Sequence, residues 1–401
     1  MRRLFQISFL IAVLGSQAFG APLESRIFTP YFNMGLSQGA YLPSSGDFFT
    51  GANMNMNVGL LTKIAEKHSL FALYTLGFSG QAFRPQDTSE FDSKDLSHNF
   101  NFEYRWQIWK FLRLRPSAAY GFDYTRTAAG EIWGQGLYDS KSLGGGLAVD
   151  CPFSFWDKDA TATVNWVYRR IKFPNYTDII REFQGTDAQT ELAGGLKDQK
   201  FNEFGASLSW NKIFARLRYN FIDYNNERVV ESNGTYGTQR QRDSNVILSA
   251  GFERQLWIFE AAPEVSYAIH RSNQNFLLFQ SATDPSPVFA ANYYDYSEIG
   301  AGVPFFLNFT QKWALNLGVD WKRRAYNSRQ PREGANTFIA GQTQTNNFVT
   351  FSAGLRKRMN EVAFMTLNYS YVVATSNNKF QRYLPSNYTG QSIALGFQIT
   401  Y

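Results

Sequence analysis

The amino-acid sequence predicts an all-β fold, a transmembrane antiparallel up-and-down β-barrel of about 16 strands. Three observations lead to this prediction. Apolar and polar residues alternate with a period of two through most of the chain, as in strands whose two faces meet different environments. Short turns and long polar loops follow one another in alternation, and tryptophan recurs beside the short turns.

The alternation is clearest in a few segments. Residues 97–108 place aromatic and aliphatic side chains at even positions and Asn, Glu, Arg and Gln at most odd positions. Residues 112–126 and 389–401 repeat the pattern of one apolar and one polar face. Beyond the first 20 residues no stretch of 18 apolar residues occurs, so no transmembrane helix is expected. An aromatic content of 17% with a mean hydropathy of −0.33 fits strands that show lipid only one face.

Runs of this kind predict 16 strands along the chain. They are expected near residues 27–41, 51–64, 69–83, 97–108, 112–126, 141–152, 160–173, 201–210, 213–226, 243–255, 258–272, 293–306, 312–326, 346–358, 362–376 and 389–401. The first strand alternates poorly and contains Pro30, and Pro116 and Pro263 fall inside two others. Because proline removes a ladder hydrogen bond, we expect a bulge or a late start of pairing at Pro116 and Pro263.

The connections predict which end of the barrel faces which compartment. Short turns are expected around residues 65–68, 109–111, 153–159, 211–212, 256–257, 307–311 and 359–361. Longer loops separate them, and those at 128–141 and 174–200 are candidates for folding into the barrel as a constriction. The unusually apolar loop at 273–292 is expected to fold over the mouth, to contact a neighbouring subunit or to bind an apolar ligand. Transmembrane barrels have short periplasmic turns and long extracellular loops. An even strand count then returns both ends of the barrel to the periplasmic side.

Tryptophan supplies an independent observation. Five tryptophans lie at or beside the predicted short turns: Trp109, Trp156, Trp210, Trp257 and Trp313. Indole rings favour the headgroup level of a membrane, so these residues predict an aromatic girdle at the periplasmic rim.

The N-terminus predicts export from the cytoplasm. Residues 1–20 combine Arg2 and Arg3 with an apolar run and a small-residue end, as in a signal peptide cleaved after Gly20. A membrane anchor is the alternative, but about 11 apolar residues are too few to span a bilayer as a helix. We therefore expect Sec-type export of residues 21–401, folded as one barrel domain. Its one cysteine, Cys151, allows no internal disulfide.

The last strand carries the most specific pattern in the chain. Ile393, Leu395, Phe397, Ile399 and Tyr401 share one face, and the sequence ends on the aromatic residue. With this end and the pattern of strands before it, the sequence resembles the outer-membrane β-barrel proteins of Gram-negative bacteria, and in size and strand count the general porins. The resemblance implies an outer-membrane location, contact with its lipids, and recognition of the last strand by the barrel-assembly machinery.

With one face assigned to lipid, the other lines the interior. A barrel of about 16 strands is wide enough for a water-filled channel. The charged residues predicted to face this lumen are Arg105, Arg113, Arg115, Arg216, Arg218, Glu253, Glu260 and Glu264. Arginines on one sector and carboxylates on another would set a field across the pore and tune its selectivity. Alternatively, these side chains form ion pairs with neighbours and have only a structural role in the wall, since Arg216 or Arg218 could reach Glu253. The sequence leaves both interpretations open.

Signals of catalysis are weak. The chain has three histidines, no His/Cys cluster for a metal and no Gly-rich phosphate loop, so we expect no enzyme and no cofactor. The segment His270–Asn273 resembles the His-x-Ser-Asn stretch of outer-membrane phospholipase A. However, its parity places His270 and Ser272 toward the lumen, and Gln274 stands where that family has glycine.

These observations predict a passive diffusion channel for small hydrophilic solutes. A plugged barrel that serves as a structural or ligand-binding surface protein is the second hypothesis, and a lipid-acting enzyme is the third. A homo-oligomer is compatible with the sequence. No nucleic-acid partner is expected, because the formal charge of +6 includes the two arginines of the signal peptide and the rest is dispersed.

Overall fold

The computed structural model describes residues 27–44, 49–81, 94–127, 131–177, 194–278, 288–334, 337–380 and 386–401. The predicted signal peptide and the middle of several long loops lie outside the described residues. No helix able to cross a membrane occurs in the described part of the chain.

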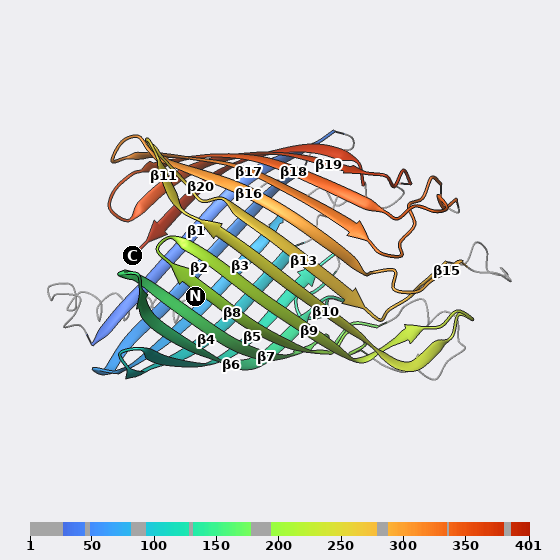
Figure 1. Cartoon of the computed structure of the whole chain (residues 1–401), viewed down its shortest axis with the longest axis horizontal. Coiled ribbons are helices and arrows are strands. Elements are labelled where there is room, and N and C mark those ends of the chain that lie inside the picture. The colour runs from blue at the N-terminus through green and yellow to red at the C-terminus, as the bar shows by residue number, and fades with distance from the viewer. Residues whose placement is uncertain are drawn as a thin grey trace.

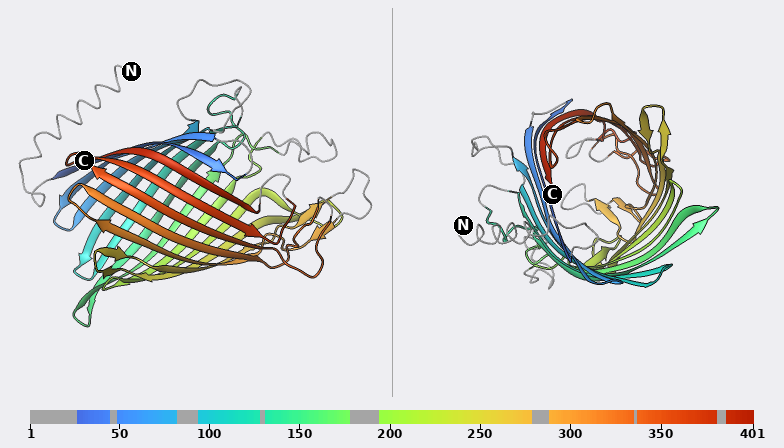
Figure 2. Two further views of the ribbon diagram at one scale, coloured as in Figure 1. Left: turned by 90° about the horizontal axis from the view of Figure 1, so that it is seen from above. Right: turned by 90° about the vertical axis from the view of Figure 1, so that its left-hand side faces the viewer.

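Antiparallel strands form a closed ring (Figures 1 and 2). In chain order they are β1 (Phe28–Pro43), β2 (Phe49–Ala65), β3 (His68–Gln81), β4 (Lys94–Trp109), β5 (Leu112–Arg126), β6 (Ser140–Phe155), β7 (Lys158–Lys172), β8 (Gln199–Trp210), β9 (Ile213–Val230), β10 (Tyr236–Phe252), β11 (Arg254–Leu256), β12 (Phe259–Ala261), β13 (Glu264–Ser272), β16 (Tyr296–Asn308), β17 (Trp313–Tyr326), β18 (Thr345–Arg358), β19 (Ala363–Ser376) and β20 (Tyr388–Thr400). Because β11 continues β10 and β12 precedes β13 after short breaks, these 18 strands occupy 16 positions in the ring. The predicted fold class and strand count are confirmed.

The ring closes between its first and last strands. β1 and β20 pair from Asn33 with Thr400 to Pro43 with Gly390. The main chains of Phe32 and Tyr401 add two further hydrogen bonds, of 3.0 and 2.7 Å. Pro30 lies before this seam begins, so its missing N–H costs no bond to β20. The poorly alternating first strand is therefore a wall strand.

The two interior prolines are accommodated differently. Around Pro116 the β4–β5 ladder is interrupted without a change of register, and Pro116 still pairs with Leu147 of β6; the register shift of the β4–β5 ladder lies nearer the turn, between Gln107 and Trp109. Pro263 lies in the break between β12 and β13, which divides the strand predicted at 258–272. The strand predicted at 243–255 is likewise divided, at Glu253. Both breaks lie at the short-turn end, where β11 and β12 form a small hairpin.

The connections differ at the two ends of the barrel. Two-residue turns such as Trp156–Asp157 and Asn211–Lys212 have positive φ at both positions, between 41° and 71°, as tight antiparallel hairpins require. Longer connections lie at the other end, where a separate hairpin of β14 (Phe276–Leu278) and β15 (Val288–Ala290) lies beyond the wall strands (Figure 1). The predicted alternation of short turns and longer connections is confirmed.

Outward side chains form an apolar belt. Leu143 of β6, Val164 of β7 and Leu395 of β20 are 65%, 61% and 56% exposed, and apolar outward residues recur on the other wall strands. So large an exposed apolar surface is unfavourable in water and favourable in lipid. The closed ladder satisfies the backbone without water, which is the requirement for crossing a membrane.

Candidate functional site

The lumen wall is the candidate functional site, and strand register assigns its residues. Directly paired residues of neighbouring strands lie on the same face of a sheet. Arg113 of β5 pairs with Asp150 of β6, which pairs with Thr163 of β7, so all three side chains belong to one face. This face is opposite to the apolar belt.

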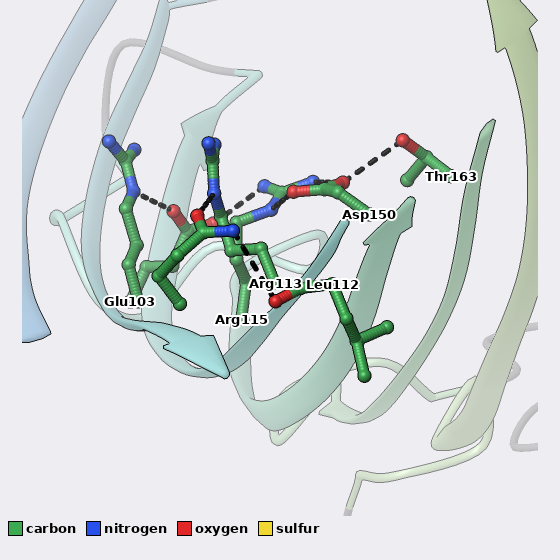
Figure 3. Close-up of polar contacts among 8 residues, drawn as sticks. Glu103, Leu112, Arg113, Arg115, Asp150 and Thr163 are labelled. Carbon is green, nitrogen blue, oxygen red and sulfur yellow. Dashed lines mark hydrogen bonds and ion pairs between the residues drawn. The ribbon is translucent and has the colours of Figure 1, made fainter. Parts of the chain in front are cut away.

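Arg115 is the centre of a charged network on this wall (Figure 3). Its Nε and Nη2 donate to the two oxygens of Asp150 at 2.7 and 2.9 Å, and its Nη1 donates to Glu103 at 3.0 Å. Thr163 donates a further hydrogen bond of 3.0 Å to Asp150. The Arg115 side chain is 27% exposed and that of Asp150 only 10%, so this bidentate pair is partly shielded from water.

The two neighbouring arginines are held less firmly. Arg105 donates a hydrogen bond of 2.6 Å from Nε to Glu103. The same carboxylate also accepts a hydrogen bond from Arg115. Arg113 donates from Nε to the side-chain oxygen of Gln107 at 3.0 Å, and among the described residues it has no carboxylate partner. Arg105 and Arg113 both border two hollows in the wall, of about 360 and 310 Å³. Lys63 and Lys67 line the larger hollow, which is therefore predominantly basic.

The second predicted group of charges is more dispersed. Arg216 approaches Glu264 at 3.9 Å and packs on Phe214, 4.3 Å from its ring centre. The two partners are 57% and 39% exposed, so this ion pair contributes little. Arg218 pairs in register with Ile247 on the lumen face, and within the described residues its side chain has no ion pair. The partner of Arg216 is thus Glu264 rather than Glu253.

Glu253 and Glu260 lie at the short-turn end. Glu253 is exposed in the break between β10 and β11. Glu260 pairs in register with Phe306 of β16. In the described part of the chain neither carboxylate forms an ion pair, so the structure does not bring them together with the predicted arginines.

Sequence reasoning missed the partners of the arginines. Asp150 and Glu103 occupy lumen positions by parity but were not predicted as site residues. A third missed pair joins Arg324 of β17 to Glu298 of β16 at 2.8 Å, with the guanidinium 4.2 Å from the Tyr296 ring centre. Opposite charges at lumen parity on strands adjacent in the ring were the available signal, but choosing partners requires the register.

The five predicted tryptophans all lie at the short-turn end. Trp109 and Trp210 are the last residues of β4 and β8, and Trp313 is the first of β17. Trp156 and Trp257 lie in turns, and the Trp257 side chain is 86% exposed. Their role as a membrane-interface girdle stays a prediction.

The C-terminal residues lie on the outer face. Ile393, Leu395 and Phe397 are exposed there, and Ile399 shares their parity on β20. Tyr401 follows the strand with an exposed ring, while its main chain is bonded to Phe32. Recognition of these residues by assembly machinery stays a prediction.

His270 and Ser272 have separate neighbours on the lumen face of β13. The His270 ring stacks on that of Tyr296 with centres 4.9 Å apart. The buried Ser272 accepts a hydrogen bond from the Gln274 main chain at 3.1 Å, and its own N–H donates to Asp295 at 2.7 Å. No group of three or more His, Cys, Asp or Glu side chains that could hold a metal occurs in the described ranges.

Three successive long connections pack together at the far mouth. The Arg332 guanidinium, after β17, lies 5.0 Å from the ring centre of Phe276, after β13, and 4.9 Å from that of Phe338. The Arg332 N–H donates to Asn378, after β19, at 2.8 Å. Viewed from the short-turn end, β14 and β15 fall within the outline of the ring (Figure 2). This cluster therefore covers part of the long-loop mouth.

The two other candidate loops contact each other instead. The Tyr138 and Tyr176 rings meet edge to face with centres 5.5 Å apart. Asn175 donates to the main-chain oxygen of Gly136 at 3.0 Å. Residues 128–130, 178–193 and 279–287 of the candidate loops lie outside the described residues.

Comparison with known proteins gives similarity of architecture. No protein-family model and no curated protein matches the chain. OmpT of Vibrio cholerae is 10% identical, covering 94% of this chain and 99% of its own, with a TM-score of 0.44. CdiB from Acinetobacter baumannii is 10% identical (92% and 60% covered, TM-score 0.49), and the ferric enterobactin receptor PfeA of Pseudomonas aeruginosa is 7% identical (92% and 80%, 0.43). At these identities and scores no activity transfers to this chain.

The architecture itself identifies the class of protein. An antiparallel ring with an apolar outer belt, a polar inner face and short turns at one end has the construction of a bacterial outer-membrane barrel. It satisfies every requirement for spanning lipid with strands. The described chain therefore has the fold of a membrane-spanning antiparallel β-barrel of 16 strand positions.

Proposed function

We propose that the protein is a channel for the passive diffusion of small hydrophilic solutes. The observation that carries this proposal is the contrast between its two faces, because a wall built only for packing would not need a polar interior. Barrels of 16 strands enclose an aqueous lumen, whereas barrels of eight are filled by side chains. In the described part of the chain, all strands except β14 and β15 belong to the wall.

The test is single-channel recording of the purified, folded protein in planar bilayers. We expect stepwise current increments that grow linearly with voltage. Protein that migrates on gels as a heat-modifiable barrel, yet carries no current in repeated insertions, would exclude the channel. The same preparation denatured by heat before addition is the control.

A second candidate function follows from the loop cluster around Arg332. If these loops seal the long-loop mouth, the barrel presents a binding surface and conducts poorly. Replacing Arg332 with Ala removes the contacts to Phe276 and Phe338. A variant that conducts when the native protein does not would favour the plugged barrel. Equal conductance in both would favour the channel.

A further inference from the structure

Six adjacent strands present almost no charge to the lumen. In ring order they are β18, β19, β20, β1, β2 and β3, joined across the closing seam. Read by register, the lumen positions of β1, β3, β19 and β20 include no Asp, Glu, Lys, Arg or His. The lumen charges of β2 and β18 are Lys63, Arg356 and Arg358, all near the short-turn end. The ion pairs described above belong to the remaining wall.

The uncharged sector consists largely of amides, hydroxyls and glycines. We define the neutral lane by the lumen-facing residues Ser37, Asn53, Asn55, Ser79, Thr366 and Gln398. They border a hollow of about 450 Å³, and a second hollow of about 520 Å³ adjoins it and shares Asn53 and Ser79. Each volume lies within the range of ~300–1,000 Å³ that holds small ligands in proteins.

The amides of the neutral lane retain hydrogen-bonding capacity. The Asn55 oxygen accepts from Asn57 at 2.8 Å, and Asn57 in turn accepts from Thr75 at 2.8 Å. This chain fixes the orientation of Asn55 and leaves its amide N–H groups for another partner. Asn53 is exposed, and within the described residues its side chain has no hydrogen bond. An amide offers two donors and an acceptor oxygen, which suits a ligand that both donates and accepts.

The one carboxylate at the edge of both hollows is already engaged. Asp95 accepts from Thr125 at 2.8 Å and from Ser79 at 3.3 Å. Asp95 pairs in register with Ser79 on β3 and with Thr125 on β5. Two wall hydroxyls therefore occupy part of its lone-pair capacity, while its negative charge remains at the edge of both hollows.

Two glycines, Gly35 and Gly390, shape the two hollows of the neutral lane. A Cβ at Gly35 would meet no atom within 4 Å, so the main chain of β1 lies open to the first hollow. The ring of Tyr41, which lines the second hollow, packs directly over the main chain of Gly390. A Cβ added to Gly390 would lie only 2.6 Å from Cζ of Tyr41. An aromatic ring beside hydroxyls and amides matches a pyranose, which has apolar C–H faces and a rim of hydroxyls.

We propose that the neutral lane binds uncharged polyhydroxylated solutes of the saccharide class as they pass through the lumen. This proposal rests on the proposed channel function, and it specifies the class of solute that binds to the lumen wall during passage. Each hydroxyl of such a solute can donate and accept hydrogen bonds, and amide and hydroxyl side chains can do both in return. Apart from Asp95, the two hollows offer a charged solute no counter-charge, so its transfer from water to this surface costs free energy.

The experiment uses the trisaccharide raffinose with the full-length folded protein. Interruption of single-channel current by raffinose and saturation-transfer NMR in detergent give two independent readouts, one of which needs no conduction. Replacing Asn53 and Asn55 with Leu should weaken raffinose binding about tenfold, the effect of two lost hydrogen bonds. Ser207→Leu, on the lumen face of β8 in the opposite wall, is the matched control and should leave binding unchanged.

Gly35→Gln provides a second variant that does not remove an amide. Because its side chain meets open space, the fold should tolerate it while the hollow fills. We expect raffinose binding to fall by at least fivefold.

The outcomes separate the two proposals. Conducting channels without raffinose binding would overturn the neutral lane and leave the channel standing. Binding that is lost in the lane variants without any conductance would overturn the channel and support the lane. Equal loss in Ser207→Leu, or equal binding of citrate as a charged probe, would also overturn the lane.

Discussion

Arg113 and Arg115 lie two residues apart on β5, yet their surroundings differ. Arg115 makes three hydrogen bonds to two carboxylates, whereas Arg113 makes one to an amide. Breaking a shielded bidentate pair leaves a carboxylate without its partner, while losing a bond to a neutral amide costs less. At the scale of the residue, structural pairing describes Arg115 and charge exposed to the lumen describes Arg113.

Stability should distinguish the two arginines. We expect Arg115→Ala to lower the free energy of unfolding by about 1–3 kcal/mol, because Asp150 loses both of its guanidinium bonds. Arg113→Ala is the matched control and should cost less than about 1 kcal/mol. Urea titration in lipid vesicles, followed by tryptophan fluorescence, measures both. Equal effects would contradict the assignment.

Ion selectivity should depend more on Arg113 than on Arg115, the reverse of the order expected for stability. Arg113→Glu replaces an arginine without a carboxylate partner by an anion beside the basic hollow, so the reversal potential in a KCl gradient should move toward that of a cation-selective pore. The shift should shrink at 1 M salt, where the screening length falls to about 3 Å. A reversal potential unchanged at low salt would make Arg113 a wall residue only. Arg115→Gln, which removes a paired charge, should change selectivity less.

The identity of these lumen residues follows from parity, but their partnerships do not. Parity assigns Arg105, Arg113 and Arg115 to the lumen from the sequence alone. Pairing Arg115 with Asp150 requires the register between two strands joined by the long loop after β5, and a loop of that length does not determine register.

At the scale of the element, the period of two located the wall strands wherever one face meets lipid. It failed at the long-loop end of β9 and β10, where the first strand was expected to end at residue 226 and the second to begin at 243. The ladder continues there to Val230 and from Tyr236 with two register shifts, which interrupt the period of two, and the outward face carries the ion pair Arg242–Asp223 at 2.9 Å. Once the outer face is polar, hydrogen bonding continues while the sequence pattern disappears. Pro263 accounts for the break between β12 and β13, because proline cannot donate a ladder hydrogen bond.

β20 supports a prediction about assembly. Tyr401→Ser keeps both main-chain bonds to Phe32 and removes the exposed aromatic ring. If the ring is the recognised feature, the folded fraction in the outer membrane should fall several-fold while refolding of the purified chain in detergent is unchanged. Gln398→Ala, on the lumen face of the same strand, is the control. Comparable losses in both variants would point to a general defect of the strand.

At the scale of the whole molecule, closure of the ring is the feature on which the other assignments depend. Apart from register shifts near the ends of the β2–β3, β4–β5 and β9–β10 ladders, parity is consistent between neighbouring strands, including the seam, so inner and outer faces are defined all the way round. The separation of charge into one sector and amides into another emerges only from this closed order. No single strand shows it, because the sector is joined across β20 and β1, which are distant in sequence and adjacent in the ring.

A cross-link across the seam tests the closure directly. Ser37 and Gly396 are register partners, and a Cβ at Gly396 would lie 3.6 Å from that of Ser37, within the range of about 3.5–4.5 Å found in disulfides. With Cys151 replaced by Ser, the pair Ser37→Cys and Gly396→Cys should oxidise in the folded barrel, although the Thr366 hydroxyl must rotate away. Mass spectrometry of the cross-linked peptide is the measurement.

The register supplies the control for this cross-link. Ser37→Cys with Ala394→Cys is displaced by two residues along β20, so it should oxidise far less. Efficient cross-linking of the displaced pair, or none in either, would refute the pairing of β1 with β20.

The seam also has a topological consequence. Between the described wall strands the chain makes eight longer connections at one end and seven short ones at the other, and Tyr401 lies beside β1 at the eighth short position. A peptide link there would complete a circle in which any other short turn could be cut to make new ends. Circular permutants with their ends at other short turns should therefore form the same closed barrel.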